Sequence, residues 1–133
     1  MRVVLDTNVL VSGLLNRNGK PFQVLKLVLD GEIILLTDER IFSEYVEVLF
    51  RPVFRFPLAE VSEILDLVKR QGEPGVAIHL TAGLPDPDDA PFLEVAVSGE
   101  ADALVTGNLR HFPVRHGIRV VDPAGFLRLR EAR

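Results

Sequence analysis

The sequence predicts an α/β domain of three layers, with helices on both faces of a mainly parallel sheet of about four to five strands. Short apolar runs of strand length alternate along the chain with longer stretches at helical spacing. Polar side chains follow directly after several of the apolar runs, as they do at the carboxyl ends of strands in open parallel sheets. The length of 133 residues suits one domain, expected to span residues 1–133.

The first third of the chain contains two predicted strands and one predicted helix. Residues 3–5 are branched and apolar and form the first strand. Residues 11–18 are mixed in character, and Gly13 within them indicates a turn. Pro21 marks the start of a helix that ends at Asp30, because proline is favoured in the first helical turn. Residues 33–36 are the second strand.

The remaining elements follow in the same alternating order. The helices are expected at residues 39–50, 57–70, 88–98 and 124–131, with Thr37, Asp38 and Asp122 as residues that can cap helix starts. The strands are expected at residues 76–78, 103–105 and 118–121, the first of these as a short third strand or an edge segment. Residues 81–87 are expected to form a loop.

Composition excludes several classes of function. The chain has no cysteine, which rules out disulfides, zinc–thiolate sites and cysteine nucleophiles. It has no apolar run of about 18 residues and no signal-peptide pattern, so we expect a cytoplasmic protein without a membrane segment.

Charge is distributed unevenly, although the net charge is only −4. Residues 84–102 carry six acids and no base, whereas residues 109–133 carry six arginines and two acids. An acidic focus beside a basic segment suits a metal site that acts on a polyanion. A solvated acidic loop followed by a helix with a basic last turn explains the same pattern without any site.

Four polar clusters stand at the ends of the predicted elements and carry the candidate chemistry. They are Asp6-Thr7-Asn8 after the first strand, Ser43-Glu44 on a helix, the acids Asp86, Asp88 and Asp89 before a helix, and Thr106-Gly107-Asn108 after a late strand. Because parallel strands end at one edge of a sheet, where the helices also begin, these acids are expected to converge. Converging carboxylates repel one another unless a cation compensates them, and hard oxygen ligands suit Mg²⁺ or Mn²⁺.

Each of these residues also has a purely structural explanation. Asp6 could cap a turn, Glu44 could be an exposed helical acid, and one acid of residues 86–89 is needed as a helix cap. Thr106 and Asn108 could be ordinary turn residues. The three histidines, His79, His111 and His116, show no ligand spacing with one another and are interpreted as lying outside any metal site.

Taken together, the blocks resemble the PIN-domain family, and in particular the toxin components of VapC-type toxin–antitoxin pairs. The matching residues are Val4-Leu5-Asp6-Thr7-Asn8-Val9, the region of Ser43 and Glu44, Asp86-x-x-Asp89-x-x-x-Leu93-x-x-Ala96, and the block from Ala101 through Thr106-Gly107-Asn108 to His111-Phe112. The resemblance runs from residue 1 to about residue 126, in the family's order.

The resemblance implies roles for individual residues. Asp6, Glu44 and Asp89 resemble the metal-coordinating acids of the family, and Thr7 and Asn8 resemble the residues that orient the first acid, with Thr106 as a further supporting residue. A fourth acid is common in the family at the place of Asn108. The amide of Asn108 offers a carbonyl oxygen but no charge, and it cannot act as a base.

The resemblance further implies a metal-dependent endoribonuclease that cleaves single-stranded RNA, a homodimer, and a protein antitoxin as partner. Arg110, His111 and Arg115 are candidates for holding the RNA backbone, together with His116 and Arg119. Surface charge that keeps the protein in solution is the alternative explanation for these basic residues.

Rival families fail on a missing residue. A receiver domain and a phosphatase of the haloacid dehalogenase type each need a lysine late in the chain, and the last lysine here is Lys69. The remaining alternative is a PIN-like RNA-binding or scaffold protein in which Asn108 has weakened or removed the nuclease activity.

Overall fold

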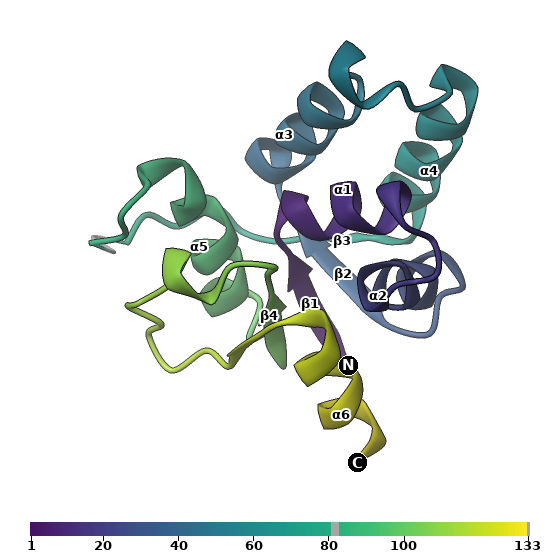
Figure 1. The fold of residues 1–133 in the computed structure, drawn as a ribbon. Coiled ribbons are helices and arrows are strands. Elements are labelled where there is room, and N and C mark those ends of the chain that lie inside the picture. The colour runs from purple at the N-terminus through teal and green to yellow at the C-terminus, as the bar shows by residue number, and fades with distance from the viewer. Residues whose placement is uncertain (81–82, 133) are drawn as a thin grey trace.

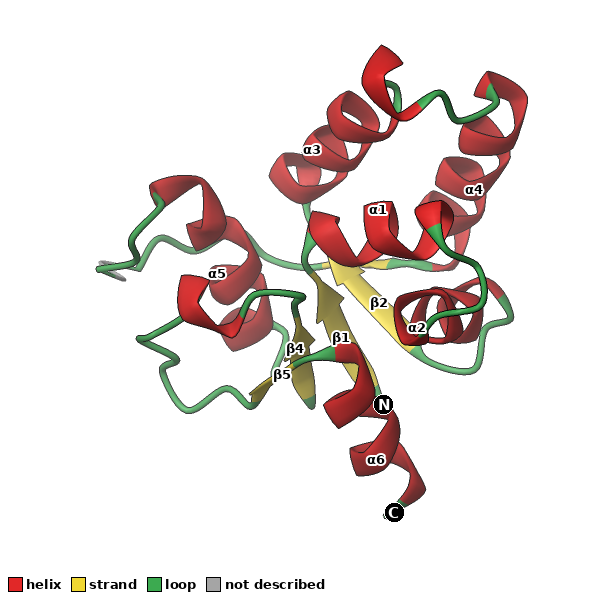
Figure 2. Ribbon diagram, viewed as in Figure 1, coloured by secondary structure: helices red, strands yellow, loops and turns green. Residues whose placement is uncertain are grey.

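The computed structural model describes residues 1–80 and 83–132, which form a five-stranded sheet with helices on both faces (Figures 1 and 2). The strands are β1 (Arg2–Leu5), β2 (Ile34–Thr37), β3 (Glu73–Pro74), β4 (Ala103–Val105) and β5 (Val120–Val121). They are parallel and lie in the order β3-β2-β1-β4-β5. The predicted three-layer α/β fold with a parallel sheet is confirmed.

The helices fall into two groups around this sheet. Their bounds are α1 (Thr7–Leu15), α2 (Lys20–Leu29), α3 (Glu39–Leu49), α4 (Leu58–Gln71), α5 (Ala90–Ser98) and α6 (Pro123–Glu131), with short 3₁₀ helices at Pro52–Phe54, Pro87–Asp89 and Leu109–His111. Helix α2 packs against α1, α4 and α6, whereas α5 packs directly on β1, β2 and β4. Figure 1 shows α5 on the other side of the sheet from α1 and α2.

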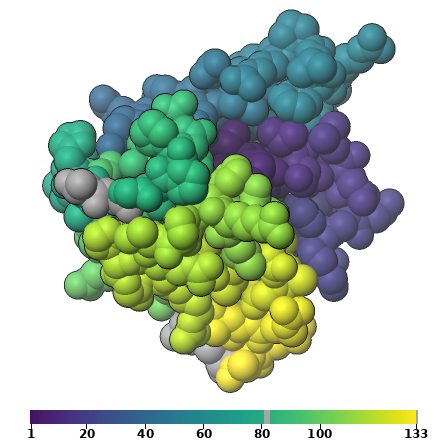
Figure 3. Space-filling model, turned by 60° about the vertical axis from the view of Figure 1, so that its left-hand side comes forward, coloured from purple at the N-terminus to yellow at the C-terminus, as the bar shows by residue number. Residues whose placement is uncertain are grey.

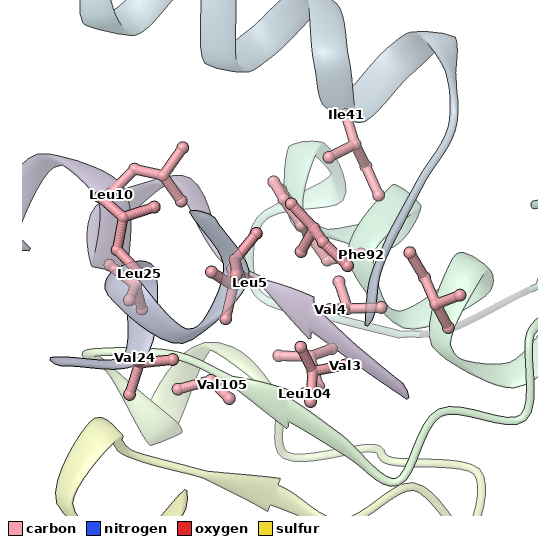
Figure 4. Packing of buried hydrophobic residues seen from close by; sticks show 14 of the residues in the cluster. Val3, Val4, Leu5, Leu10, Val24, Leu25, Ile41, Phe92, Leu104 and Val105 are labelled. Atoms are coloured by element: carbon pink, nitrogen blue, oxygen red, sulfur yellow. The ribbon is translucent and has the colours of Figure 1, made fainter. Parts of the chain in front are cut away.

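Strand β1 is the centre of the core, as its apolar sequence predicted. Val3, Val4 and Leu5 are fully buried between the helical layers (Figure 4). Burial of each such side chain contributes about 1.5–3 kcal/mol relative to exposure. Leu5 lies beside Val105 of β4, so the residues that follow these two strands leave the sheet side by side.

The order in which strands are added to the sheet reverses between β1 and β4. From β1 the chain passes to β2 and β3 on one side, and then crosses back to β4 and β5 on the other. Open α/β sheets bind ligands in the crevice outside the carboxyl ends of the strands at such a switch point. Asp6 and Thr106, which follow β1 and β4, therefore stand where a ligand site is expected.

One helix was missed in the sequence. Residues 11–18 were expected to be irregular, but α1 continues to Leu15. Gly13 does not make a turn there. A Cβ atom at this position would lie 3.2 Å from the backbone of Phe22, so the glycine lets α1 and α2 approach closely. The glycine that allows this close packing was misread as a turn signal.

The third strand also lies elsewhere than predicted. It comprises Glu73–Pro74 and pairs with Leu36 and Thr37 of β2, whereas Val76, in the predicted segment 76–78, is 75% exposed. Hydrophobicity gives no guidance at this edge of the sheet, where proline is tolerated because its missing N–H faces away from the ladder. Of the predicted loop 81–87, residues 81–82 lie outside the described residues.

The predicted helix starts at Asp38 and Asp122 are confirmed by their contacts. The Asp38 carboxylate accepts a hydrogen bond from the backbone N–H of Ile41, and that of Asp122 accepts one from Gly125. Within residues 1–80 and 83–132, every helix is too short or too polar to cross a bilayer.

Candidate active site

Asp6 directly follows β1, and its side chain is held by residues of α1 and of the turn after β4. Its side chain is almost completely buried. The Thr106 hydroxyl donates a hydrogen bond of 2.8 Å to Asp6 Oδ2, and the Asn8 side-chain amide donates one of 3.2 Å to the same oxygen. Burial raises the pKa of Asp6, and the bond from Thr106 lowers it in part. The supporting contacts expected of Asn8 and Thr106 are therefore present.

Asn8 also ties the turn after β4 to the turn after β1. Its side-chain oxygen accepts a hydrogen bond of 2.9 Å from the backbone N–H of Gly107. A Cβ atom at Gly107 would lie 3.3 Å from this oxygen, so a larger residue would press against the Asn8 side chain. The two turns that carry Asp6 and Asn108 are thus fixed relative to each other.

Glu44 reaches the same edge of the sheet from α3. The Thr7 hydroxyl donates a short hydrogen bond to Glu44 Oε2. The backbone N–H of Thr7 donates a hydrogen bond to the Asp6 carboxylate, whereas its hydroxyl contacts the second acid. The adjacent Tyr45 is fully buried, and its hydroxyl donates a 2.6 Å hydrogen bond to the carbonyl of Leu5. This bond fixes α3 against the end of β1.

The environment of Glu44 disfavours its charge. Burial raises the pKa of Glu44 most, although the hydrogen bond from Thr7 lowers it. The negative charges of Asp6 and Asp88 raise the pKa further. The charge of Asp6 therefore acts on Glu44, as expected for carboxylates that share a site.

Asp89 comes to the site from the short helix Pro87–Asp89 before α5. Its side chain is 13% exposed, and its Oδ2 atom is buried without a hydrogen-bond partner among the described residues. Burial, followed by the charge of Asp6, raises the pKa of Asp89 to about 6. A buried carboxylate oxygen that lacks a donor is costly, so this atom is suited to bind a cation.

His111 and Asn108 adjoin Asp89 from the turn after β4. The Nδ1 atom of His111 lies 3.4 Å from Asp89 Oδ2, and its Nε2 atom lies 2.9 Å from the side-chain nitrogen of Asn108. Asn108 Oδ1 accepts a hydrogen bond from the backbone N–H of Arg110. In Figure 3 the yellow-green segment after β4 lies against the teal-green segment that leads into α5.

The fold brings together a set of possible ligands that differs from the predicted set. Asp6, Asp89 and His111 each offer one ligand atom, and these three atoms lie within 4.8 Å of one another. Glu44 is close enough to interact electrostatically with Asp6 but is not in this group. His111, interpreted from its spacing as lying outside any metal site, is thus placed beside two of the three predicted acids.

The other candidate acids have structural positions. Asp86 accepts a hydrogen bond from the backbone N–H of Asp88 and caps the short helix, as expected for one acid of this cluster. Asp102 accepts a hydrogen bond from the backbone N–H of Arg2, at the amino ends of β4 and β1. It therefore lies at the edge of the sheet opposite Asp6, where its place before the strand predicted it.

The surface around the site combines acidic and basic groups. A cleft of about 440 Å³ beside the acids is lined by Arg40, Ser43, Glu44, Glu47, Pro87, Asp88 and Pro91. Arg110 and Arg115 are exposed on the segment after β4. The Nε atom of Arg115 donates to the carbonyl of Phe112, which restricts its side chain to this segment.

His111 and Tyr45 are the neighbours of the acids that sequence reasoning did not place there. His111 has no ligand partner at a regular spacing, and the sequence pattern indicates no role for the Tyr45 hydroxyl. The available signal for His111 was its position three residues after Asn108, in the turn that follows β4 beside the acids.

The fold and these side chains define an α/β domain with carboxylates gathered at the switch point of a parallel sheet. A family model described as PIN domain matches residues 2–110. An uncharacterised protein of Methanocaldococcus jannaschii is 31% identical over 111 residues, which span 81% of this chain and 71% of that protein. The chain belongs to the PIN domain family, whose members are generally hydrolytic nucleases.

A solved structure has the same fold. It is the crystal structure of VapBC2 from Rickettsia felis bound to a DNA fragment from their promoter. The match has a TM-score of 0.57 and 15% sequence identity, and it covers 90% of this chain and 97% of the matched chain.

Proposed function

We propose that this protein is a divalent-metal-dependent endoribonuclease that hydrolyses phosphodiester bonds of single-stranded RNA. The observation that carries the proposal is the convergence of Asp6, Glu44 and Asp89 in a PIN domain, each with a raised pKa. Among the described residues, no lysine or arginine forms an ion pair with any of the three. Apart from His111 beside Asp89, no basic side chain pairs with these acids in the part of the chain that the structure describes, and their charge is left for a cation to compensate.

The donor set fits Mg²⁺ or Mn²⁺. Asp89 Oδ2 is buried without a hydrogen-bond donor, and Asp6 Oδ2 is oriented by the Thr106 hydroxyl and the Asn8 side-chain amide. Asp6, Glu44 and Asp89 would hold the ion, with Asn108 and His111 adjoining them. A bound divalent ion lowers the pKa of water and stabilises charge on a phosphodiester during hydrolysis.

The remaining residues would orient the acids and the substrate. Thr106 and Asn8 fix the Asp6 carboxylate, and Thr7 fixes that of Glu44. Arg110 and Arg115, with His111 between them, face the solvent on the segment beside the acids and suit the phosphates of a single strand.

The test is cleavage of a generic single-stranded RNA in Mn²⁺ or Mg²⁺ by the wild type, by Asp6→Asn and by Asp66→Asn. Asp66 is exposed on α4, so its variant controls for the loss of one acid outside the site. We expect cleavage by the wild type and Asp66→Asn only. Equal cleavage by Asp6→Asn would contradict the proposal, because the activity would then come from a contaminant.

We further propose that the protein is the toxin of a toxin–antitoxin pair and acts as a homodimer. The VapBC2 fold match supports this role. Induced expression in a bacterial host should arrest growth for the wild type but not for Asp6→Asn, and co-expression of a short neighbouring reading frame should relieve the arrest. Growth unaffected by the wild type would contradict the toxin role. A monomeric mass in light scattering would contradict the homodimer.

A second candidate function rests on Asn108. Because its amide carries no charge where the family commonly has a fourth acid, an RNA-binding protein without nuclease activity would have the same fold. RNA binding without cleavage in any divalent metal would favour this function.

A further inference from the structure

His111 is held in place by the backbone of the turn that carries it. It ends the short helix Leu109–His111, in which its N–H donates a 3.1 Å hydrogen bond to the carbonyl of Asn108. The next residue, Phe112, is fully buried in the core and anchors the turn. The imidazole is therefore positioned by the fold and does not reach the acids by side-chain flexibility alone.

The Nδ1 edge of the ring faces the acids. Nδ1 is 3.4 Å from the donorless Oδ2 atom of Asp89, and a ligand atom of His111 lies within 4.8 Å of those of both Asp6 and Asp89. Two carboxylate oxygens and one imidazole nitrogen gathered in this way could hold one metal ion. The 3.4 Å between His111 Nδ1 and Asp89 Oδ2 is less than twice a bond of about 2.0–2.1 Å, so these two atoms can bind the same ion.

Asn108 faces the other ring nitrogen, and its chemistry suits both states of the imidazole. Without a metal, its NH₂ group lies 2.9 Å from Nε2, so that Nε2 accepts and the ring proton sits on Nδ1 toward Asp89. A ring that binds metal through Nδ1 carries its proton on Nε2 and needs an acceptor there. The amide provides one by turning its oxygen to the ring, which breaks its hydrogen bond with the backbone N–H of Arg110, whereas a carboxylate could only accept.

We infer that His111 is an imidazole ligand of the metal site, held by Asn108, and that the site prefers Mn²⁺ to Mg²⁺ for this reason. The inference rests on the proposed metal-dependent function. Imidazole binds transition metals far better than Mg²⁺, which favours oxygen donors. Asn108, the residue that departs from the acid common in the family, would thus be matched to a histidine ligand and not a lost catalytic group.

The test is pulsed electron paramagnetic resonance of Mn²⁺ bound to the whole protein, without RNA. The wild type and the control His79→Gln should show coupling to a directly bound nitrogen, because His79 is exposed on another segment. His111→Gln should lose the coupling and lower the preference for Mn²⁺ over Mg²⁺ at least about tenfold in competition titrations. His111→Asp should bind without the coupling and favour Mg²⁺. Asn108→Leu should retain the coupling with about tenfold weaker Mn²⁺ binding.

Absence of nitrogen coupling in wild type, coupling unchanged in His111→Gln, or no Mn²⁺ binding would overturn the inference. An RNA-cleavage assay run in parallel separates it from the proposed function. Nitrogen coupling without cleavage would leave the ligand assignment standing and remove the nuclease. Mn²⁺-dependent cleavage without the coupling would support the nuclease and remove His111 as a ligand.

Discussion

Two clusters of buried or half-buried acids in this protein have opposite electrostatic surroundings. In the structural cluster, Asp38 and Glu94 are buried around the guanidinium group of Arg40, which lies 2.7 Å from Asp38 Oδ2 and 2.6 Å from Glu94 Oε1. Backbone N–H groups of Ile41 and Leu80 supply further hydrogen bonds to these two acids. In the site cluster, Asp6, Glu44 and Asp89 have no such cation, and the pKa of each is raised.

The difference separates acids that stabilise the fold from acids that are available for chemistry. A buried carboxylate paired with arginine and backbone donors is satisfied, and removing one partner leaves an uncompensated charge. A carboxylate without a cation has its protonated form favoured and is costly when ionised. Asp6 and Asp38 are both buried, so burial alone does not distinguish these two acids, but their partners do.

The largest expected effect is on activity, at the site cluster. Asp6→Asn should lower RNA cleavage by about 10²–10³-fold, because a metal ligand supplies several kcal/mol of charge stabilisation. The thermal midpoint should stay the same or rise, since the change removes one of three mutually repelling carboxylates. Cleavage rates and thermal denaturation of the same preparation check both. A marked fall in the midpoint would show that Asp6 stabilises the fold as the acids around Arg40 do.

The next effect is on stability, at the structural cluster. Glu94→Gln should destabilise the fold by about 2 kcal/mol, because it removes a charge-assisted hydrogen bond to Arg40 and leaves that cation partly uncompensated. Urea denaturation measures the loss, with exposed Glu63→Gln on α4 as the control. Metal affinity should be unchanged in the folded variant. A stability equal to that of the control would contradict the assignment.

A smaller effect is the pH dependence of the metal-free protein. The pKa of Asp89 is raised to about 6 in the folded state, above its ordinary value of 3.8, so folding favours the protonated form. This group therefore destabilises the fold above pH 6 and does so progressively less as the pH falls from about 6 towards 4. The thermal midpoint should rise when the pH is lowered from 7 to 5, and it should rise less in Asp89→Asn. An identical slope in the variant would contradict the raised pKa.

The smallest effect is expected on RNA affinity. Arg110→Ala should weaken binding several-fold and lower the salt dependence by about one phosphate contact, whereas Arg70→Ala on α4 should do neither. Fluorescence anisotropy with single-stranded RNA at several salt concentrations measures both quantities. Equal affinities for the two variants would place the RNA away from the segment after β4.

The sequence indicated most of the fold because its two central strands, β1 and β4, are buried on both faces. The short apolar runs at residues 3–5 and 103–105 favoured interior strands, which placed Asp6 at the carboxyl edge of the sheet. Gly13 and the edge strand Glu73–Pro74 were misread because each depends on a neighbour that the sequence does not name: the backbone of Phe22 in one case and β2 in the other.

The sequence by itself determined the order of the elements and the position of Asp6, since both follow from local patterns of apolar and polar residues. Only the tertiary structure decided which acids remain without a cation, that Thr7 contacts Glu44, and that His111 lies beside Asp89. These are contacts between segments far apart in the chain. Their geometry is set by packing, by the burial of Phe112 and by the hydrogen bond from Tyr45 to Leu5. Local sequence patterns do not predict these contacts.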